Sequence, residues 1–226
     1  YIGPAGERLS PMACVLNDYS RAAGRGGTGA VIGSKKLKGV VCTGKLPIKI
    51  ADKAGLNALT KSVAEFLKDH PMMANMRSAG STGAFLPNLM SGDTCVKNYS
   101  VSLEETGKTV KDFERLGAPK ISDEYKTESY SCVSCPMRCG AEVQVKEGKY
   151  KTDENSKVAR PEYESLGWFG PGIMNEDPEV VIACNHLCNE YGLDTISTGG
   201  TLGWVYECFN NGVLTKEELD GIEPYW

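Results

Sequence analysis

Hydrophobic positions recur at helical spacing in the middle of the chain. Between residues 51 and 70, apolar side chains come every three or four positions, at Leu56, Leu59, Val63, Phe66 and Leu67. This spacing predicts an amphipathic helix whose apolar face packs against a core, and Pro71 is expected to end it. Glycines then break residues 72–91 into short helical pieces.

The last third of the chain carries helix start and stop signals. Asp177 followed by Pro178 is typical of a helix start, and Gly192 is typical of a helix end. We expect three helices here: one over 177–192, one from Asp194 or Ser197 to Gly212, and one after a capping box over 215–218.

Strand signals are few. Residues 37–43 form a short apolar run that predicts a buried strand, and 142–146 alternates and turns toward 149–151, which predicts a hairpin. Residues 92–120 are polar and irregular, and 122–131 are expected to form a short helix. The predicted fold class is therefore mainly α with a small β-containing N-terminal part.

Composition narrows the class of protein. The chain has 226 residues, 41% hydrophobic and 24% charged, which suits one large or two small globular domains. Its net charge of -4 gives no general attraction for nucleic acid, and no apolar run is long enough to cross a membrane. The nine cysteines are an odd, scattered set, which favours a reducing compartment and a cytoplasmic location.

Three thiols stand close together in Cys132-Val-Ser-Cys135-Pro-Met-Arg-Cys139. Thiolates are soft ligands, so this spacing predicts an iron–sulfur or zinc site that lacks one ligand. Cys184 and Cys188, one helical turn apart, are a candidate source of the missing ligand, and the alternative is a small buried side chain at each position. The remaining cysteines are expected to pack in the core: Cys14, Cys42, Cys95 and Cys208.

A glycine-rich segment over 20–33 contains Arg21 and Arg25. Glycine lets the backbone approach a ligand, and guanidinium groups bind phosphate through two parallel hydrogen bonds. The segment is not a Walker loop, because no Gly-Lys-Ser or Gly-Lys-Thr follows. It predicts either a phosphorylated cofactor site or a flexible turn.

Four motifs in this order resemble the aldehyde ferredoxin oxidoreductase family: Arg21-Ala-Ala-Gly-Arg-Gly-Gly-Thr-Gly29, the three-cysteine run followed by Gly140, Pro161-Glu-Tyr-Glu164 and Tyr191-Gly-Leu-Asp-Thr-Ile-Ser-Thr198. The resemblance covers the middle of a family member. It implies that residues 1–48 are the end of the β-rich pterin-binding domain and that 49–226 are the helical second domain.

The resemblance also implies cofactors. Cys132, Cys135 and Cys139 would bind a 4Fe-4S cluster, with the fourth cysteine beyond Trp226. A tungsten or molybdenum bis-pterin would lie beside the cluster, with a magnesium ion bridging the pterin phosphates. Pterin-binding positions map onto these residues: Arg21, Ala22, Arg25, Asn189, Leu193 and Asp194. The family has Asp where Asn189 stands, which changes that contact, and Asp194 is also expected to be a helix N-cap.

The implied reaction is the oxidation of a small aldehyde to a carboxylate. Electrons would pass to ferredoxin or another electron-transfer subunit, and assembly as a homo-oligomer is left open. Either Glu162 or Glu164 matches the family's glutamate near tungsten. A buried carboxylate with a raised pKa suits proton transfer during addition of water to a carbonyl carbon. The sequence does not choose between the two residues.

Other functions remain open at this point. A class II aryl-CoA reductase-type catalytic subunit shares a similar cysteine loop, although the Gly192-Leu-Asp-Thr-Ile-Ser-Thr198 run is closer to the aldehyde branch. A non-catalytic iron–sulfur or zinc-binding module is the alternative from a different class. Metal content separates these hypotheses.

Overall fold

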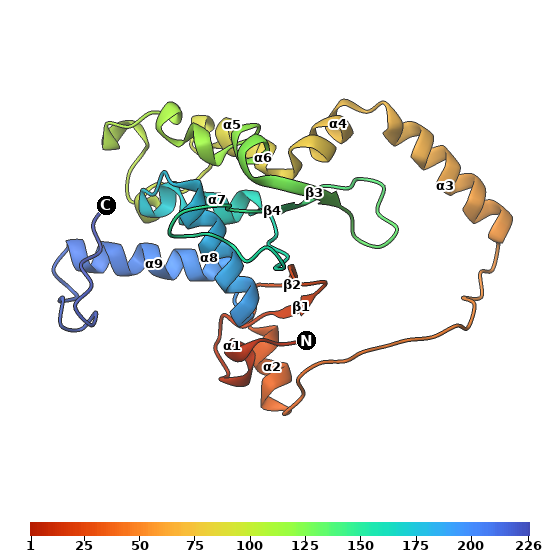
Figure 1. The fold of residues 1–226 in the computed structure, drawn as a ribbon, viewed down its shortest axis with the longest axis horizontal. Coiled ribbons are helices and arrows are strands. Elements are labelled where there is room, and N and C mark those ends of the chain that lie inside the picture. Colours follow the sequence, from red (N-terminus) through yellow and green to blue (C-terminus); the bar gives the residue numbers. More distant parts are fainter.

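The computed structural model describes all residues from Tyr1 to Trp226 and is mainly helical, with two small antiparallel sheets (Figure 1). The predicted fold class is confirmed. The α-helices are α1 (Pro4–Glu7), α2 (Thr28–Ser34), α3 (Lys53–Lys68), α4 (Pro71–Ser78), α5 (Phe85–Ser91), α6 (Lys120–Tyr125), α7 (Tyr163–Phe169), α8 (Pro178–Tyr191) and α9 (Thr195–Asn210). The strands are β1 (Val15–Asn17), β2 (Arg21–Ala23), β3 (Lys126–Tyr130) and β4 (Gly140–Val143). None of the helices combines the length and the apolar character that crossing a membrane requires.

Short 3-10 helices connect the central elements. They are η1 (Gly80–Ala84), η2 (Lys97–Tyr99), η3 (Glu104–Thr106), η4 (Val110–Leu116) and η5 (Pro171–Ile173). The expected short helical pieces over 72–91 are present as the rest of α4, η1 and α5. His70 caps α4 because its Nδ1 accepts a hydrogen bond from the Met72 amide at 3.3 Å. Pro71 therefore starts α4 as well as following α3.

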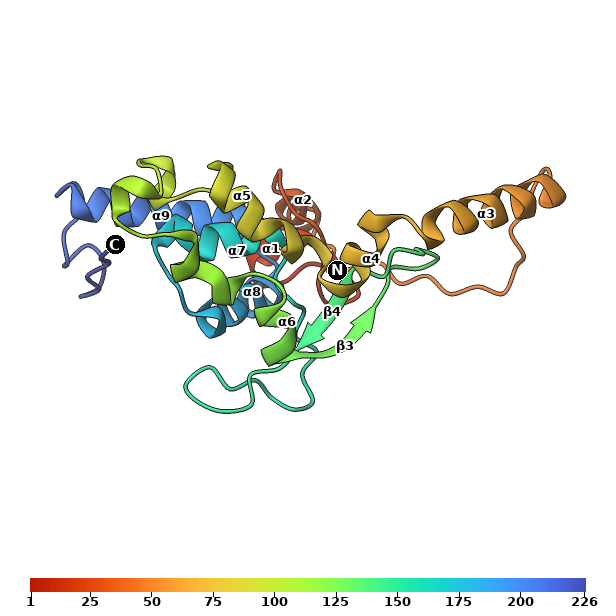
Figure 2. The same ribbon diagram turned by 90° about the horizontal axis from the view of Figure 1, so that it is seen from above.

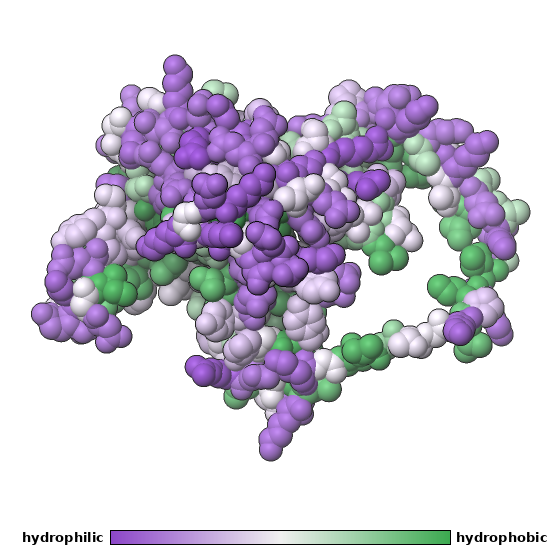
Figure 3. Space-filling view, viewed as in Figure 1, coloured by the Kyte–Doolittle hydropathy of each residue, from purple (hydrophilic) through white to green (hydrophobic).

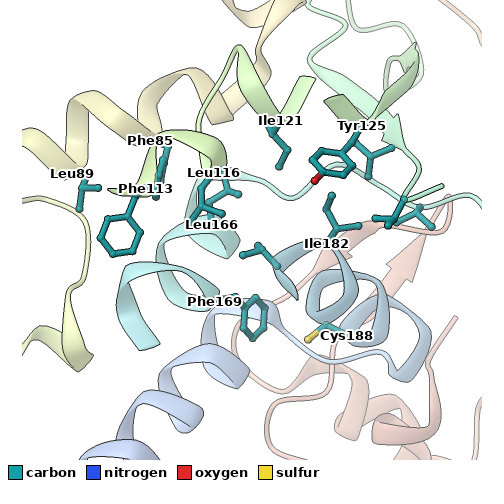
Figure 4. Close-up of a cluster of buried hydrophobic side chains, with 14 of the residues drawn as sticks. Phe85, Leu89, Phe113, Leu116, Ile121, Tyr125, Leu166, Phe169, Ile182 and Cys188 are labelled. Carbon is teal, nitrogen blue, oxygen red and sulfur yellow. The ribbon is translucent and has the colours of Figure 1, made fainter. Parts of the chain in front are cut away.

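The hydrophobic core lies where α7 and α8 meet the short helices α5, η4 and α6 (Figure 4). Phe169 and Leu166 of α7 are fully buried, and Ile182 of α8 packs in the same cluster. Burying one such side chain contributes roughly 1.5–3 kcal/mol. This core holds α7, α8 and α9 together, and those helices carry much of the site described below.

Helices α8 and α9 begin as predicted, and α8 also ends as predicted, whereas α9 ends at Asn210, two residues before the expected Gly212. The Asp177 side chain accepts a hydrogen bond from the Glu179 amide at 2.9 Å, and Gly192 ends α8 with a left-handed φ of 72°. Asp194 caps α9 by accepting from the Ser197 amide at 2.9 Å. The predicted third helix is wrong. The capping bonds between Thr215 and Glu218 form, but the chain makes only turns there.

The N-terminal elements pack against the end of α8. Strand β1 pairs with β2, with Asn17 opposite Arg21. The Cys14 amide donates to the Gly192 carbonyl at 2.9 Å, and the Asp194 amide donates to the Met12 carbonyl at 2.9 Å. These bonds bring the arginine–glycine segment beside the turn between α8 and α9, although the two are far apart in sequence.

The second sheet differs from the predicted hairpin. Strand β4 pairs with β3, which occupies part of the expected helix over 122–131, so both predictions are partly wrong. Residues 149–151 form no strand, although the Thr152 amide donates to the Val145 carbonyl at 3.0 Å. Strand β4 pairs with β3 because β3 lies beside it and offers four paired residues, which stabilise the sheet through cross-strand contacts. The cysteine loop is the connection between β3 and β4.

After Gly39, which lies against Tyr1, residues 40–52 and α3 stand away from the rest of the chain (Figures 1 and 2). The predicted strand over 37–43 is wrong, because its only backbone bond to another segment is from the Ile2 amide to the Lys38 carbonyl at 2.9 Å, and one bond makes no ladder. The predicted helix is confirmed as α3, but its core-facing character is wrong. Its apolar side chains are exposed, Phe66 by 69%, and green patches mark them in Figure 3. The predicted domain boundary after residue 48 falls in this segment and stays a prediction.

Candidate functional site

A cavity of about 650 Å³ lies where the two sheets, α7 and the turn between α8 and α9 meet. All the predicted site residues line it except Arg25, Cys132 and Cys135. The lining residues that were predicted are Arg21, Ala22, Cys139, Glu162, Glu164, Asn189, Leu193 and Asp194. Segments separated by more than a hundred residues therefore share one concave surface, which is the usual setting of a ligand site.

Arg21 projects from β2 into this cavity and is only partly paired. Its Nη1 donates to Glu162 Oε1 at 3.2 Å, and its guanidinium carbon lies 4.9 Å from the centre of the Tyr130 ring. The Nε and Nη2 atoms are buried and have no hydrogen-bond partner in the chain. Buried N–H groups without acceptors are rare, and two free donors on a cation are suited to binding an anionic group.

Gly140 follows the last cysteine of the loop and lies directly against Arg21. A Cβ at this position would overlap Arg21 Nη2 and the Tyr130 ring. Glycine at 140 therefore allows the guanidinium to lie next to the cysteine loop. Arg21, whose free N–H groups face the cavity, therefore also lies against the backbone at the end of the cysteine loop.

The glycine-rich segment contributes its first half to the cavity. Ala22 and Ala23 line the cavity, and a Cβ on Gly24 would lie 3.0 Å from Asp194 Oδ1. Arg25 points elsewhere. It lines a separate pocket of about 360 Å³ with Trp168 and Trp204.

The turn from Asn189 to Asp194 forms the opposite wall. Leu193 bridges to Ala13, and Asp194 is buried with one carboxylate oxygen accepting from both the amide and the hydroxyl of Ser197. Asp194 is thus the N-cap of α9 and a wall of the cavity. The two roles considered from the sequence are compatible, because the second carboxylate oxygen takes no part in the cap.

Glu162 and Glu164 both line the cavity but have different neighbours. Glu162 accepts from Arg21 and from the Ser81 hydroxyl. Glu164, in the first turn of α7, forms no ion pair or hydrogen bond within the chain. The Glu164 carboxylate also affects a neighbouring thiol. Burial, and after it the charge of Glu164, raises the pKa of Cys95 to about 12.

The cysteine loop lies at the edge of the cavity. Cys132 is exposed, Cys135 and Cys139 are partly buried, and Cys139 alone lines the cavity. Burial, followed by the Glu162 charge, raises the pKa of the Cys139 thiol. No group of three His, Cys, Asp or Glu side chains in the chain forms a metal-binding arrangement, this loop included.

The other cysteines do not complete a metal site. Cys188 belongs to the core cluster and Cys184 packs against it. Cys14 and Cys95 are buried, as expected for packing residues, and Cys208 is partly buried. Cys42 is exposed, so its predicted core position is wrong in this chain. The residues around Cys42, from 39 to 50, are all exposed here.

Family models for aldehyde ferredoxin oxidoreductase match two parts of the chain. The model of domains 2 and 3 matches residues 58–226, and the model of the N-terminal domain matches residues 1–44. The chain belongs to the aldehyde ferredoxin oxidoreductase family. The recognised resemblance is therefore confirmed, and the chain comes from an oxidoreductase family.

Curated relatives are similar in sequence over nearly the full length of this chain. The tungsten-containing aldehyde ferredoxin oxidoreductase of Pyrococcus furiosus is 35% identical over 226 residues, 99% of this chain and 35% of that protein. The protein of the same name from Thermococcus kodakarensis is 35% identical over 99% of this chain and 35% of its own length. The WOR-like subunit of a P. furiosus aliphatic sulfonate oxidoreductase is 31% identical over all of this chain and 34% of its own length. The chain thus spans about a third of the length of these relatives.

A solved structure shares the fold. The active-site complex BamBC of benzoyl-coenzyme A reductase, bound to 1,5-dienoyl-CoA, superposes with a TM-score of 0.74 at 21% identity, over 97% of this chain and 33% of that chain. At this identity the likeness concerns the fold alone. The aldehyde ferredoxin oxidoreductase fold is therefore common to proteins with different substrates.

The residues of this family member fit the cofactors that the family implies. The unpartnered Nε and Nη2 atoms of Arg21 suit the phosphate of a pterin cofactor, and the cavity leaves room beside them. Three cysteines within one loop suit a soft metal cluster by their chemistry, although their side chains do not converge in this chain. The donor sets thus agree with a pterin and an iron–sulfur cluster.

Sequence reasoning missed several residues of the site. Tyr130 stacks on Arg21 and exchanges a hydrogen bond of 3.0 Å with Ser20. Asn185 is buried and donates to the Ala159 carbonyl at 3.0 Å. Arg160 is buried beside Cys139. Arg160 had a signal in the sequence, because it directly precedes the recognised Pro161 motif.

Proposed function

We propose that this chain belongs to an enzyme that oxidises aldehydes to carboxylates at a tungsten or molybdenum bis-pterin centre. Electrons would leave through a 4Fe-4S cluster at the cysteine loop and pass to ferredoxin or another electron-transfer subunit. The observation that carries the proposal is the single cavity shared by Arg21, Cys139, Glu164 and Asp194. The names and identity of the tungsten-containing relatives support it.

Each wall of the cavity would bind a different part of the cofactor. Arg21 would donate its free N–H groups to a pterin phosphate, since a guanidinium binds phosphate oxygens in pairs. The Ala22 carbonyl is the candidate ligand of a phosphate-bridging magnesium ion. Leu193 and Asp194 would hydrogen-bond the pterin ring, with Asn189 nearby in place of the family's Asp.

Cys132, Cys135 and Cys139 would bind the cluster as thiolates. The fourth ligand would come from a part of the protein outside these residues, because Cys184 and Cys188 lie in and against the core. Binding would draw the loop together, since Cys132 is exposed and the three side chains do not converge. Metal binding and local ordering are commonly coupled in this way.

The two glutamates would have separate tasks. Oxidation of an aldehyde consumes one water and releases two electrons and two protons as the carboxylic acid forms. When bound, the metal–pterin group would supply the two-electron oxidation. Glu164, which has no partner in the chain, would accept a proton as water adds to the carbonyl carbon. Glu162 would hold Arg21 in place through its ion pair.

Metal analysis and turnover of the full-length protein test this proposal. The protein would be purified without oxygen, its tungsten, molybdenum, iron and zinc measured by plasma mass spectrometry, and one aliphatic and one aromatic aldehyde assayed with a viologen dye. We expect about one tungsten or molybdenum and about four irons per chain, with dye reduction that depends on the aldehyde. Zinc alone, or iron without aldehyde oxidation, would contradict it and favour a non-catalytic metal-binding module.

An aryl-CoA reductase-type function is the second candidate. The benzoyl-coenzyme A reductase structure shares the fold with a TM-score of 0.74, which supports considering it. Assays of the same preparation with benzoyl-CoA and with 1,5-dienoyl-CoA separate the two. Turnover of the thioesters without turnover of free aldehydes would favour this second candidate.

A further inference from the structure

Arg160 is a buried cation at the point where the cysteine loop joins β4. The residue is only 6% exposed. Its Nη2 donates to the Cys139 carbonyl at 2.8 Å, and its Nη1 donates to the Ser122 hydroxyl at 3.2 Å. The Ser78 carbonyl accepts a longer bond from Nη1 at 3.4 Å. One guanidinium therefore ties the last cysteine of the loop to α4 and α6.

The junction is packed tightly from the opposite side. Gly80 has a left-handed φ of 62° and lies directly over the bond between Arg160 and Cys139. A Cβ at Gly80 would overlap Arg160 Nη2 and come within 2.6 Å of the Cys139 carbonyl oxygen. The backbone of Arg160 adds a further tie, because its amide donates to the Ala141 carbonyl at 2.8 Å. The backbone of Cys139 is thus held firmly in place, whereas Cys132 is exposed.

The charge of Arg160 has no carboxylate bonded to it. Its acceptors are two carbonyls and a hydroxyl, all neutral. The carboxylate that acts on the pKa of Arg160 is that of Glu162, and Glu162 is already bonded to Arg21 and Ser81. A buried cation is costly unless an anion compensates it. A cluster held by thiolates at this loop is negatively charged and would provide that compensation.

We propose that Arg160 is a positioning residue for the cluster-binding loop, fixing the Cys139 backbone so that its thiol faces the cluster and placing a positive charge beside it. The inference rests on the cluster-binding role proposed above. Hydrogen bonds and charges around cluster sulfurs set both metal retention and reduction potential. The two effects of Arg160 are separable, because one needs the planar guanidinium and the other needs only the charge.

Variants of the full-length protein separate these effects. Arg160→Lys keeps the charge and loses the planar fork, and Arg160→Gln loses both. Arg77→Gln is the matched control, because Arg77 is an exposed arginine on the neighbouring α4. We expect both Arg160 variants to lose iron affinity by about 10- to 100-fold, as for other residues that orient metal ligands. We expect the cluster midpoint potential, measured by redox titration with electron paramagnetic resonance, to fall in Arg160→Gln and to stay near wild type in Arg160→Lys.

A readout without metal tests the positioning directly. After iron is stripped from the full-length protein, alkylation of each cysteine by iodoacetamide is followed by peptide mass spectrometry. Loosening the loop end should speed alkylation of Cys139 in both Arg160 variants and leave the already exposed Cys132 unchanged. Ser122→Ala, a milder change that removes one acceptor of Nη1, should speed alkylation of Cys139 by about 2- to 10-fold.

The outcomes are decisive in each case. Wild-type iron affinity and wild-type Cys139 alkylation in both Arg160 variants would overturn the proposal, even if the thermal midpoint fell. Should the Arg160 variants fail to fold, Ser122→Ala decides, and an alkylation rate equal to that of Arg77→Gln would overturn it. A wild-type protein that binds no iron would refute the proposed function, while the alkylation comparison would still test the positioning.

Discussion

Glu162 and Glu164 are two residues apart and have opposite surroundings. Glu162 is bonded to Arg21 and Ser81, and Glu164 lines the same cavity without a partner. The sequence motif predicts a functional glutamate here but contains no information on which carboxylate is already engaged. Only the neighbours contributed by β2 and η1 distinguish the two.

Replacing the two glutamates separately tests their assignment. Glu164→Gln in the full-length protein should lower kcat by about 100- to 10,000-fold, the usual contribution of a positioned general base. Its tungsten content should not change, because Glu164 holds no other side chain. Glu162→Gln is the matched variant and should keep kcat per bound tungsten while reducing tungsten content, since Arg21 loses its ion-pair partner. Unchanged turnover in Glu164→Gln would show that this carboxylate does not handle the proton.

Buried thiols should make the stability of the chain depend on alkaline pH. Burial, and after it the Asp194 charge, raises the pKa of Cys14 from 9.0 to about 11, and the pKa of Cys95 rises to about 12. In the unfolded chain these thiols ionise near 9. The folded state keeps them protonated, so their contribution is full below pH 9 and is lost as the pH rises from 9 toward 12.

Urea unfolding at several pH values between 8 and 11 measures this effect. We expect the free energy of unfolding to fall as the pH rises across this range. The double variant Cys14→Ala with Cys95→Ala should show a shallower decline, although its stability at pH 8 should be lower because two buried side chains are shortened. An equally steep decline in both proteins would rule out these thiols as the cause.

Among the elements, those defined by local chemistry were predictable and those defined by distant partners were not. The caps at Asp177 and Asp194 and the glycine stop at Gly192 set α8 and α9 through bonds between residues close in sequence. The periodicity of α3 also predicted its helix correctly. The pairing of β4 with β3 was missed, because a strand is stable only against a partner brought by the tertiary fold.

The two helix caps offer a matched pair for testing the site. Asp194→Ala and Asp177→Ala should each lower the free energy of unfolding by about 0.5–2 kcal/mol, because each side chain accepts a bond from an amide of the first turn. Asp194 also lines the cavity, whereas Asp177 is exposed away from it. Only Asp194→Ala should therefore reduce pterin and tungsten content, measured on the full-length protein.

Equal cofactor loss in both cap variants would contradict the assignment. It would mean that cofactor binding follows the stability of the helices and that Asp194 makes no separate contact. Full retention of the cofactor in Asp194→Ala would have the same consequence for its proposed pterin contact.

At the scale of the whole molecule, helix α3 and the segment before it pack little against the rest of the chain. Helix α3 buries none of its residues, and residues 35–52 extend between α2 and α3 with exposed apolar side chains such as Val41 and Leu46 (Figure 3). Helices α5, α6, α7 and α8 share one core around Phe169 and Leu166. The chain spans about a third of the length of its relatives.

Two phenylalanines should report this difference in a protein comprising residues 1–226. Phe169→Ala should lower the free energy of unfolding by about 3–5 kcal/mol, because the ring is fully buried. Phe66→Ala should change it by less than about 0.5 kcal/mol, because the ring is 69% exposed. Urea unfolding followed by circular dichroism measures both. A large effect of Phe66→Ala would show that α3 packs against the rest of this chain.

The sequence by itself determined helices α8 and α9, the caps that start them, the family of the chain, and which side chains are available to bind a cofactor. These features depend on residues within about one helical turn of each other or on ordered motifs that can be recognised directly. The tertiary structure alone decided that Glu164 is free, that Arg160 holds Cys139 and that β3 pairs with β4. Those outcomes depend on which distant segments pack together, and burial, pairing and unsatisfied hydrogen bonds exist only once that packing is made.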